Sequence, residues 1–166
     1  MFIGDLLRAL FEARIEYAIV GGVAVNLHGV PRMTYDVDLV AAPTRENLSA
    51  LANTLRSLKL HTRIPVKLED FADRVYADEM RTERNLIAVT FTDPSDPLRE
   101  VDVLVAPPID PAELVQRAKT LQFAGTPVRV VSIEDLVAMK QATGRAQDEA
   151  DVTQLEKILR GGDHGG

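Results

Sequence analysis

The feature that most constrains the chain is the run YAIVGGVAVNLHGVPRMTYDVDLV, residues 17–40. It predicts an apolar strand, a Gly-Gly turn, a short helix and then a second strand that carries Asp36 and Asp38. Because side chains alternate faces along a strand, the two aspartates share one face. Two carboxylates held this close repel each other unless a cation or a proton lies between them. The pair therefore requires compensation from a cation, a proton or a group elsewhere in the chain.

The remaining pattern predicts an α+β protein. Apolar residues at helical spacing, several of them preceded by a capping residue or a proline, predict helices over 2–14, 44–58, 68–80, 110–118, 132–143 and 147–160. Runs rich in branched and aromatic residues predict strands over 85–92 and 99–105, with two short β segments within 121–131. We therefore expect a mixed central β-sheet of about five strands flanked by helices. Residues 59–65 are expected to form a loop or a short edge strand.

No repeat, linker or shift in composition divides the chain. With 166 residues, 46% of them hydrophobic, it is long enough to bury a substantial core. Residues 1–160 are therefore expected to form a single domain, and GGDHGG, residues 161–166, a flexible tail.

The composition also restricts where the protein works and what it binds. The chain has no cysteine, which excludes disulfides and thiolate metal sites. It has neither an apolar run that could span a membrane nor an N-terminal segment typical of secretion, so we expect a cytoplasmic protein. A net charge of −6 and a pI near 5.1 argue against charge-driven binding of nucleic acid.

A third carboxylate, Asp102, lies in the middle of the apolar strand 99–105. A charge there is costly to bury unless it is paired or coordinates a metal. Asp102 would face Asp36 and Asp38 if the two strands are neighbours. Three carboxylates form an all-oxygen ligand set, which suits Mg²⁺ or Mn²⁺ better than zinc or copper. Two such ions, about 3.5–4 Å apart, are the usual arrangement for in-line phosphoryl displacement.

The Gly21-Gly22 turn predicts a place for phosphates. Glycines between a strand and a helix let the backbone approach a ligand closely, and the helix start offers free N–H groups to an anion. Arg32 lies just before the strand of the two aspartates, where it could contact a phosphate. It could equally pair with an aspartate and hold the loop.

Three short motifs in this order resemble the signature of the DNA polymerase β-like nucleotidyltransferase superfamily. They are VGG at residues 20–22, DVDL at residues 36–39 and VDV at residues 101–103. The run from Gly21 to Val40 is most similar to the bacterial minimal nucleotidyltransferases, including the AbiEii-type toxins. The resemblance implies a nucleotidyltransferase fold, two Mg²⁺ ions on Asp36, Asp38 and Asp102, and Asp102 as the candidate general base.

The resemblance extends to SIEDLVAMKQATGRAQDEADV, residues 132–152. It implies that Lys140 reaches the nucleotide, and Arg145, Asp148 and Asp151 match the flanking positions. The residues themselves leave another interpretation open, in which Lys140 pairs with Asp148 or Asp151 across the helix turn.

Other candidate residues also have a purely structural alternative. Asp36 and Asp38 could lie on a solvated edge strand, and Asp102 could pair with Arg99. His28 could cap a helix end rather than contact a substrate. The charged segment 69–84 could contact an acceptor, but mixed charge of this kind is typical of a solvated helix face.

These observations predict an enzyme that moves a nucleoside monophosphate from an NTP to a hydroxyl and releases pyrophosphate, with a possible place in a toxin–antitoxin system. The alternative is a non-catalytic nucleotide-binding or antitoxin-like module of the same fold. A metal-dependent phosphohydrolase is a third reading, for which the three histidines offer no clear base. A small molecule, a tRNA end or a protein side chain would each fit as acceptor, and a partner chain or a second copy could complete the site.

Overall fold

The computed structural model describes residues 2–162. The helices are α1 (Phe2–Glu12), α2 (Gly21–Leu27), α3 (Arg45–Ser57), the 3₁₀ helix η1 (Leu68–Ala72), α4 (Arg74–Arg84), α5 (Pro111–Gln116), α6 (Ile133–Thr143) and α7 (Ala146–Gly162). The strands are β1 (Tyr17–Val20), β2 (Val37–Ala41), β3 (His61–Thr62), β4 (Ala88–Asp93), β5 (Asp96–Leu104), β6 (Lys119–Phe123) and β7 (Thr126–Val130). Of the predicted flexible tail, Gly161 and Gly162 end α7, and residues 163–166 lie outside the described residues.

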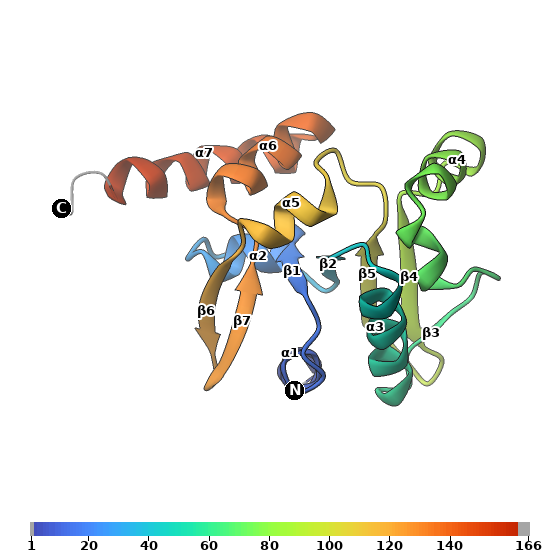
Figure 1. Cartoon of the computed structure of the whole chain (residues 1–166). Coiled ribbons are helices and arrows are strands. Elements are labelled where there is room, and N and C mark those ends of the chain that lie inside the picture. Colours follow the sequence, from blue (N-terminus) through green and yellow to red (C-terminus); the bar gives the residue numbers. More distant parts are fainter. Residues whose placement is uncertain (1, 163–166) are drawn as a thin grey trace.

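The strands form one mixed seven-stranded sheet in the order β3-β4-β5-β2-β1-β7-β6 (Figure 1). The α+β prediction is confirmed, but the expected number of about five strands is too low. One reason is β3, which has only two residues, His61 and Thr62, and pairs with β4 at the sheet edge. A strand this short has no hydrophobic periodicity, because its place is determined by the neighbouring strand rather than by its own sequence.

The central strands are not in sequence order, and this arrangement positions the site. β2 runs antiparallel to β1 on one side and parallel to β5 on the other. Strand β1 is buried along its whole length, which explains why YAIV is a continuous apolar run rather than an alternating one. The β2–β5 pair places Asp38 directly opposite Asp102.

Several predicted boundaries differ from the structure, and two of the differences affect where acidic residues lie. The strand predicted to carry both Asp36 and Asp38 begins at Val37, so Asp38 lies within β2 and Asp36 directly precedes it. The single helix expected over 68–80 is two helices, η1 and α4. Asp73 separates them, because its extended backbone stops η1 while its carboxylate accepts hydrogen bonds from the N–H groups of Val75 and Tyr76 and so caps α4.

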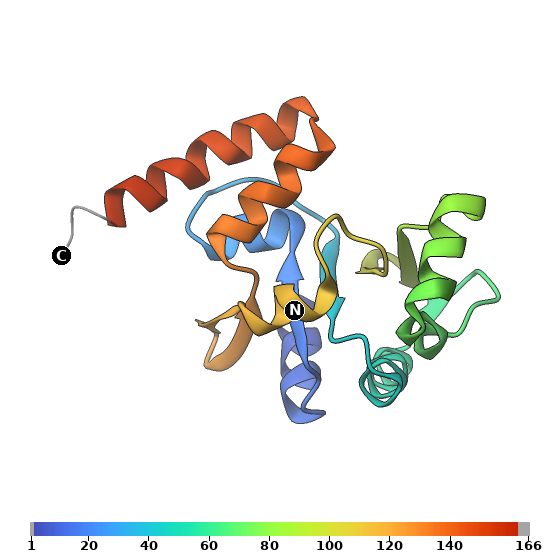
Figure 2. The ribbon, with the colours of Figure 1, turned by 45° about the horizontal axis from the view of Figure 1, so that its top comes forward.

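Helices α6 and α7 lie together above the end of β1 at which α2 begins (Figure 1). The segment between α2 and β2 passes beneath α7 (Figure 2). The apolar core extends from α1, with Leu6, Leu7 and Leu10, to Leu155 of α7. Among residues 2–162, no helix is both long and apolar enough to cross a bilayer.

Candidate active site

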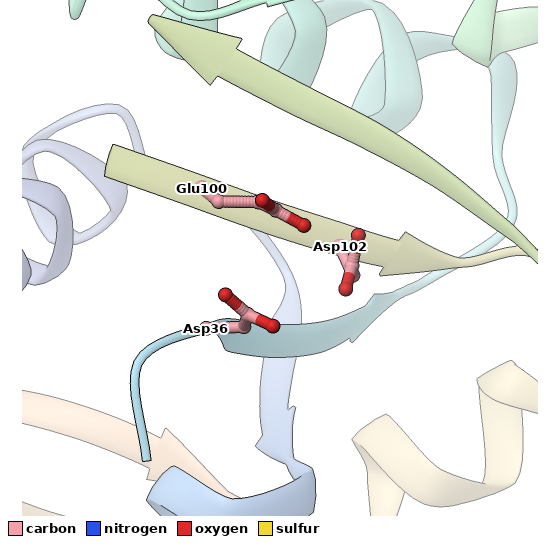
Figure 3. Close-up of side chains that lie close together, drawn as sticks. All are labelled: Asp36, Glu100 and Asp102. Carbon is pink, nitrogen blue, oxygen red and sulfur yellow. The ribbon is translucent and has the colours of Figure 1, made fainter. Parts of the chain in front are cut away.

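Four carboxylates gather on two neighbouring strands at the centre of the sheet. Asp36 directly precedes β2, Asp38 lies within it, and Glu100 and Asp102 lie in β5. Carboxylate oxygens of Asp36, Glu100 and Asp102 lie within 4.8 Å of one another, and Figure 3 shows the three side chains directed toward a common point. This geometry would allow all three to contact one cation.

Glu100 is the acidic residue that the sequence interpretation missed. It lies two residues before Asp102 in REVDV, and residues two apart in a strand share a face. The same rule that paired Asp36 with Asp38 therefore applies to Glu100 and Asp102. Burial raises the pKa of Glu100, and the charges of Asp36 and Asp102 raise it further, whereas Arg63 lowers it.

Asp38 has the most perturbed carboxyl group of the site. Burial raises its pKa to about 7, with further contributions from Asp102 and Asp36, while Lys140 acts in the opposite direction. The protein alone therefore does not neutralise the charge that these aspartates would carry together. A proton or a cation must supply the remaining compensation, which is the requirement that the DVDL motif itself suggested.

Asp102 is held in place by a hydrogen bond across the sheet. Thr90 lies opposite it in the β4–β5 pair, and Thr90 Oγ1 donates to Asp102 Oδ1 at 2.6 Å. The alternative pairing of Asp102 with Arg99 does not occur. Arg99 Nη1 instead pairs with Asp93 Oδ2 at 2.9 Å, and its Nη2 donates to the carbonyl of Leu58 at 3.0 Å. Asp102 thus keeps an oxygen for another ligand.

The two glycines of the turn are required by the packing of the site. Gly21 has a φ of +67°, and a Cβ on it would lie 2.2 Å from Asp38 Oδ2. A Cβ on Gly22 would lie 2.8 Å from Thr34 Oγ1. Both positions therefore exclude a side chain, because the β1–α2 turn lies directly against the aspartate strand and the segment that precedes it.

A cavity of about 380 Å³ lies beside the carboxylates. Six of the seven residues predicted for the site line it, namely Gly21, Gly22, Arg32, Asp36, Asp38 and Lys140. The seventh, Asp102, lies on the adjacent strand, opposite Asp38. The lining also includes Arg145, Gln147 and Asp148, from the start of α7 and the turn before it. The cavity therefore has an acidic side on β2 and a mixed, partly basic side on α6 and α7.

Lys140 and Arg32 are engaged in a network of ion pairs, as the structural alternatives for both residues proposed. Lys140 is only 7% exposed, and its Nζ lies 3.2 Å from Asp148 Oδ1 and 3.0 Å from Asp151 Oδ2. Asp151 also accepts a short hydrogen bond from Arg32 Nη1, while Arg145 Nε lies 2.9 Å from Asp148 Oδ2. Asp151 therefore connects α6, α7 and the segment before β2, and it fixes both cations where they line the cavity.

The pKa of Asp148 reflects the same network. Burial raises it, but hydrogen bonds from Thr143, Arg145 and Lys140 outweigh burial, so the pKa is lowered overall. Asp148 is thus a stable anion that balances Lys140, and this neutralisation allows Lys140 to be buried as a charged group.

His28 has a structural role. It is the C-cap residue of α2, and its Nε2 donates a hydrogen bond to the carbonyl oxygen of Val131 at 2.7 Å. This bond joins the end of α2 to the segment after β7. His28 is not among the residues that line the cavity beside the carboxylates.

The fold matches that of known nucleotidyltransferases. The lincosamide antibiotic adenylyltransferase LnuA, bound to lincomycin, aligns with a TM-score of 0.59 at 12% identity, covering 94% of this chain and 95% of that one. The enzyme ANT(2")-Ia, in complex with adenylyl-2"-tobramycin, aligns with a TM-score of 0.56 at 18% identity, covering 95% and 90%. A protein from Thermotoga maritima described as a nucleotidyltransferase aligns with a TM-score of 0.55 at 13% identity, covering 95% and 90%.

At these identities the structural matches show the fold alone, and among curated proteins none matches the chain by sequence. The family is shown by a sequence model described as "Nucleotidyl transferase AbiEii toxin, Type IV TA system", which matches residues 5–153. This range contains the glycine turn, all four carboxylates and the Lys140 network. The chain is therefore a nucleotidyltransferase that belongs to the AbiEii toxin family.

Proposed function

We propose that the protein transfers a nucleoside monophosphate from an NTP to a hydroxyl acceptor in a reaction that depends on divalent cations. Asp36, Asp38 and Asp102 would hold two Mg²⁺ ions, for which Mn²⁺ could substitute, and Glu100 adjoins them. The observation that carries the proposal is the register of β2 and β5, which brings Asp38 opposite Asp102 beside the 380 Å³ cavity. The raised pKa of Asp38 supports the fit, because burial above all, and then the charges of Asp102 and Asp36, disfavour its anion, which a bound cation would stabilise.

The lining of the cavity suggests how the NTP lies. The triphosphate would contact the backbone at Gly21 and Gly22, and Lys140 and Arg32, which line the same cavity, would balance part of its charge. Asp102 would accept the proton of the acceptor hydroxyl as its oxygen bonds to the α-phosphorus and pyrophosphate leaves. The cations would neutralise the phosphates and lower the pKa of that hydroxyl. Catalysis would rest mainly on positioning and charge neutralisation.

The family description supports a wider proposal. We propose that the enzyme acts as the toxin of a toxin–antitoxin pair in the cytoplasm, so that a partner chain would control it. Its continuous apolar core supports a single domain over residues 1–160. The alternative is a non-catalytic module that binds NTP with the same residues. Calorimetry with NTP and Mg²⁺ separates the two, because binding without pyrophosphate release across many acceptors would favour the module.

Removal of divalent cations is expected to abolish transfer. The purified protein would be incubated with each α-labelled NTP and a cell extract, with EDTA, with Mg²⁺ restored, or with Mn²⁺ in its place. We expect label in an acceptor only when Mg²⁺ or Mn²⁺ is present, since the cluster of carboxylates would otherwise repel the triphosphate. Transfer that persists in EDTA would contradict a metal-dependent mechanism.

The affinity for Mg²⁺ is expected to fall as the pH falls below about 7. Asp38 must lose its proton to bind a cation, and its pKa in the metal-free protein is raised to about 7. The dissociation constant, measured by calorimetry, should therefore rise by about tenfold for each pH unit below that value and be nearly constant above it. Binding near pH 6 should also release roughly one proton. An affinity that is constant down to about pH 5 would contradict this assignment of Asp38.

A further inference from the structure

A second hollow lies on the other side of the carboxylates from the nucleotide cavity. It has a volume of about 390 Å³, and its floor is formed by Thr90 and Thr92 of β4 with Glu100 of β5. Thr90 is the residue that donates to Asp102, so the hollow begins at the proposed general base. In the sheet order, the carboxylates of β2 and β5 separate this hollow over β4 from the glycine turn after β1.

This placement agrees with the geometry of nucleotidyl transfer. In an in-line displacement, the attacking oxygen and the leaving pyrophosphate lie on opposite sides of the α-phosphorus. With the triphosphate at Gly21 and Gly22, the acceptor must approach from the side of β4 and β5. The hollow over Thr90 and Glu100 is on that side.

The hollow continues into a larger and mostly apolar one. A cavity of about 580 Å³ shares Ile64 and Leu86 with the first, and the two together form what we call the β4 groove. Tyr76, Met80 and Arg84 form one of its walls. These three residues are four apart along α4 and therefore lie on one face of that helix.

The lining of the β4 groove changes along its length. The end next to Asp102 is lined by Thr90 and Thr92 of β4 and by Glu100 of β5, with Arg63 also in its lining. Ile64, Leu86 and Met80 make the middle of the groove apolar. Arg84 lines the far cavity, and no ion pair to it is found within residues 2–162. The groove thus offers threonine hydroxyls beside the opposite charges of Glu100 and Arg63 at the reacting end, an apolar surface in the middle and the positive charge of Arg84 at the far end.

We propose that the β4 groove binds the acceptor, and that the acceptor is a small hydroxyl compound with an apolar body and one anionic group. The inference rests on the proposed transfer reaction and names the substrate class of the same site. The acceptor oxygen forms a bond to the α-phosphorus, its proton passes to Asp102, and the bond between the α-phosphorus and pyrophosphate breaks with the electron pair leaving on pyrophosphate.

Charge distribution favours a small acceptor over RNA. Helix α4 carries three arginines, Arg74, Arg81 and Arg84, but also three acids, Asp78, Glu79 and Glu83. Arg74 donates hydrogen bonds to the backbone carbonyls of Phe71 and Val105. Arg81 Nη2 lies 3.9 Å from Asp78 Oδ1. On the α4 side of the groove, acids and arginines are equal in number, and the whole chain has a net charge of −6. This side of the groove is therefore not a basic surface that would bind the phosphates of an RNA.

The groove can be tested without turnover by the binding of 1-anilinonaphthalene-8-sulfonate, a fluorescent probe with an apolar body and one anionic group. We expect one saturable site. Ile64→Glu, at a 38% exposed position that lines both cavities, should weaken binding by about tenfold or more. The matched change Leu98→Glu, at a 70% exposed apolar residue outside the groove, should leave it unchanged. Arg84→Gln should weaken binding, and Arg81→Gln should not.

A second experiment identifies the class of molecule that becomes labelled in the transfer reaction. Wild type, Ile64→Glu and Leu98→Glu would be incubated with α-labelled NTP, Mg²⁺ and separated small-molecule, RNA and protein fractions of an extract. We expect label in the small-molecule fraction, lost with Ile64→Glu and retained with Leu98→Glu. Label only in RNA or protein, or probe binding that Ile64→Glu does not affect, would overturn the inference while the transfer reaction stands. Intact probe binding with no transfer to any fraction would overturn the proposed function, and with it the acceptor assignment.

Discussion

Replacing Asp38 with asparagine is expected to lower the rate of nucleotidyl transfer by about 10³-fold or more. The substitution keeps the shape of the side chain but removes the charge that would bind the cations between β2 and β5. Initial rates of labelled product formation, measured at saturating NTP and Mg²⁺, test this. Asp5→Asn, which removes an exposed charge from α1, is the matched control and should keep the wild-type rate. A wild-type rate in Asp38→Asn would contradict the role of Asp38.

The same variant should make the metal-free protein more stable. The pKa of Asp38 is about 7 in the folded protein against an ordinary value of 3.8, so the folded state binds more protons than the unfolded state between these values. The free energy of unfolding of the wild type therefore falls as the pH rises from about 4 to about 7. Above about pH 7, the buried charge of Asp38 lowers the free energy of unfolding of the wild type by at most about 4 kcal/mol. Asparagine carries no charge, so the variant does not lose this free energy.

Thermal unfolding in EDTA would measure this effect. The Tm of Asp38→Asn should exceed that of the wild type by several degrees at about pH 8, and by less at about pH 5. Added Mg²⁺ should raise the Tm of the wild type more than that of the variant, which keeps Asp36, Glu100 and Asp102 but lacks the fourth carboxylate. A variant that loses both activity and stability would instead indicate that Asp38 supports the fold. The opposite directions of the two changes thus distinguish a functional carboxylate from a structural one.

The carboxylates show how far the sequence could predict the site. Alternation along a strand placed Asp36 beside Asp38, and the apolar neighbours of Asp102 marked it as an unusual charge. Neither rule could show that β2 and β5 are neighbours in the sheet, because residues 42–95 lie between these two strands in the chain. The same alternation rule applies to Glu100, but Arg99 precedes it, so it lacks the apolar neighbours on both sides that mark Asp102 as an unusual charge.

The basic residues show a different limit. The sequence left open whether Lys140 and Arg32 contact a nucleotide or pair with aspartates, and the structure shows ion pairs for both while also placing both at the cavity. The two interpretations were treated as alternatives, although one aspartate, Asp151, can fix a cation without removing it from the site. Asp151 is 119 residues from Arg32, so no local pattern could have revealed this contact.

The sequence predicted a mixed sheet correctly, but it predicted about five strands where the structure has seven. The strands with strong apolar runs, such as YAIV and NLIAVTFT, were found because their own residues require burial. The edge strand β3 was predicted only as an alternative to a loop, since two residues at an edge carry no pattern. The split between η1 and α4 was not predicted, because Asp73 is one of many polar residues in this segment and only its extended backbone identifies it as a cap.

Replacing Gly21 with alanine is expected to lower the transfer rate by about 10²-fold or more, while the protein still folds. Two separate effects arise at this position. The φ of +67° strains any residue with a Cβ by roughly 1–2 kcal/mol, and the added methyl group would lie 2.2 Å from Asp38 Oδ2. Because that distance is far below van der Waals contact, the Asp38 carboxylate must move away from its position opposite Asp102.

Gly125→Ala separates the two effects. Gly125 lies in the turn between β6 and β7 with a φ of +83°, and a Cβ on it would have no neighbour within 4 Å. Both variants should therefore lose about 1–2 kcal/mol of stability in urea unfolding, but only Gly21→Ala should lose activity and Mg²⁺ affinity. Equal activity in the two variants would mean that the carboxylate tolerates displacement, and the geometry between Gly21 and Asp38 would then not be needed for transfer.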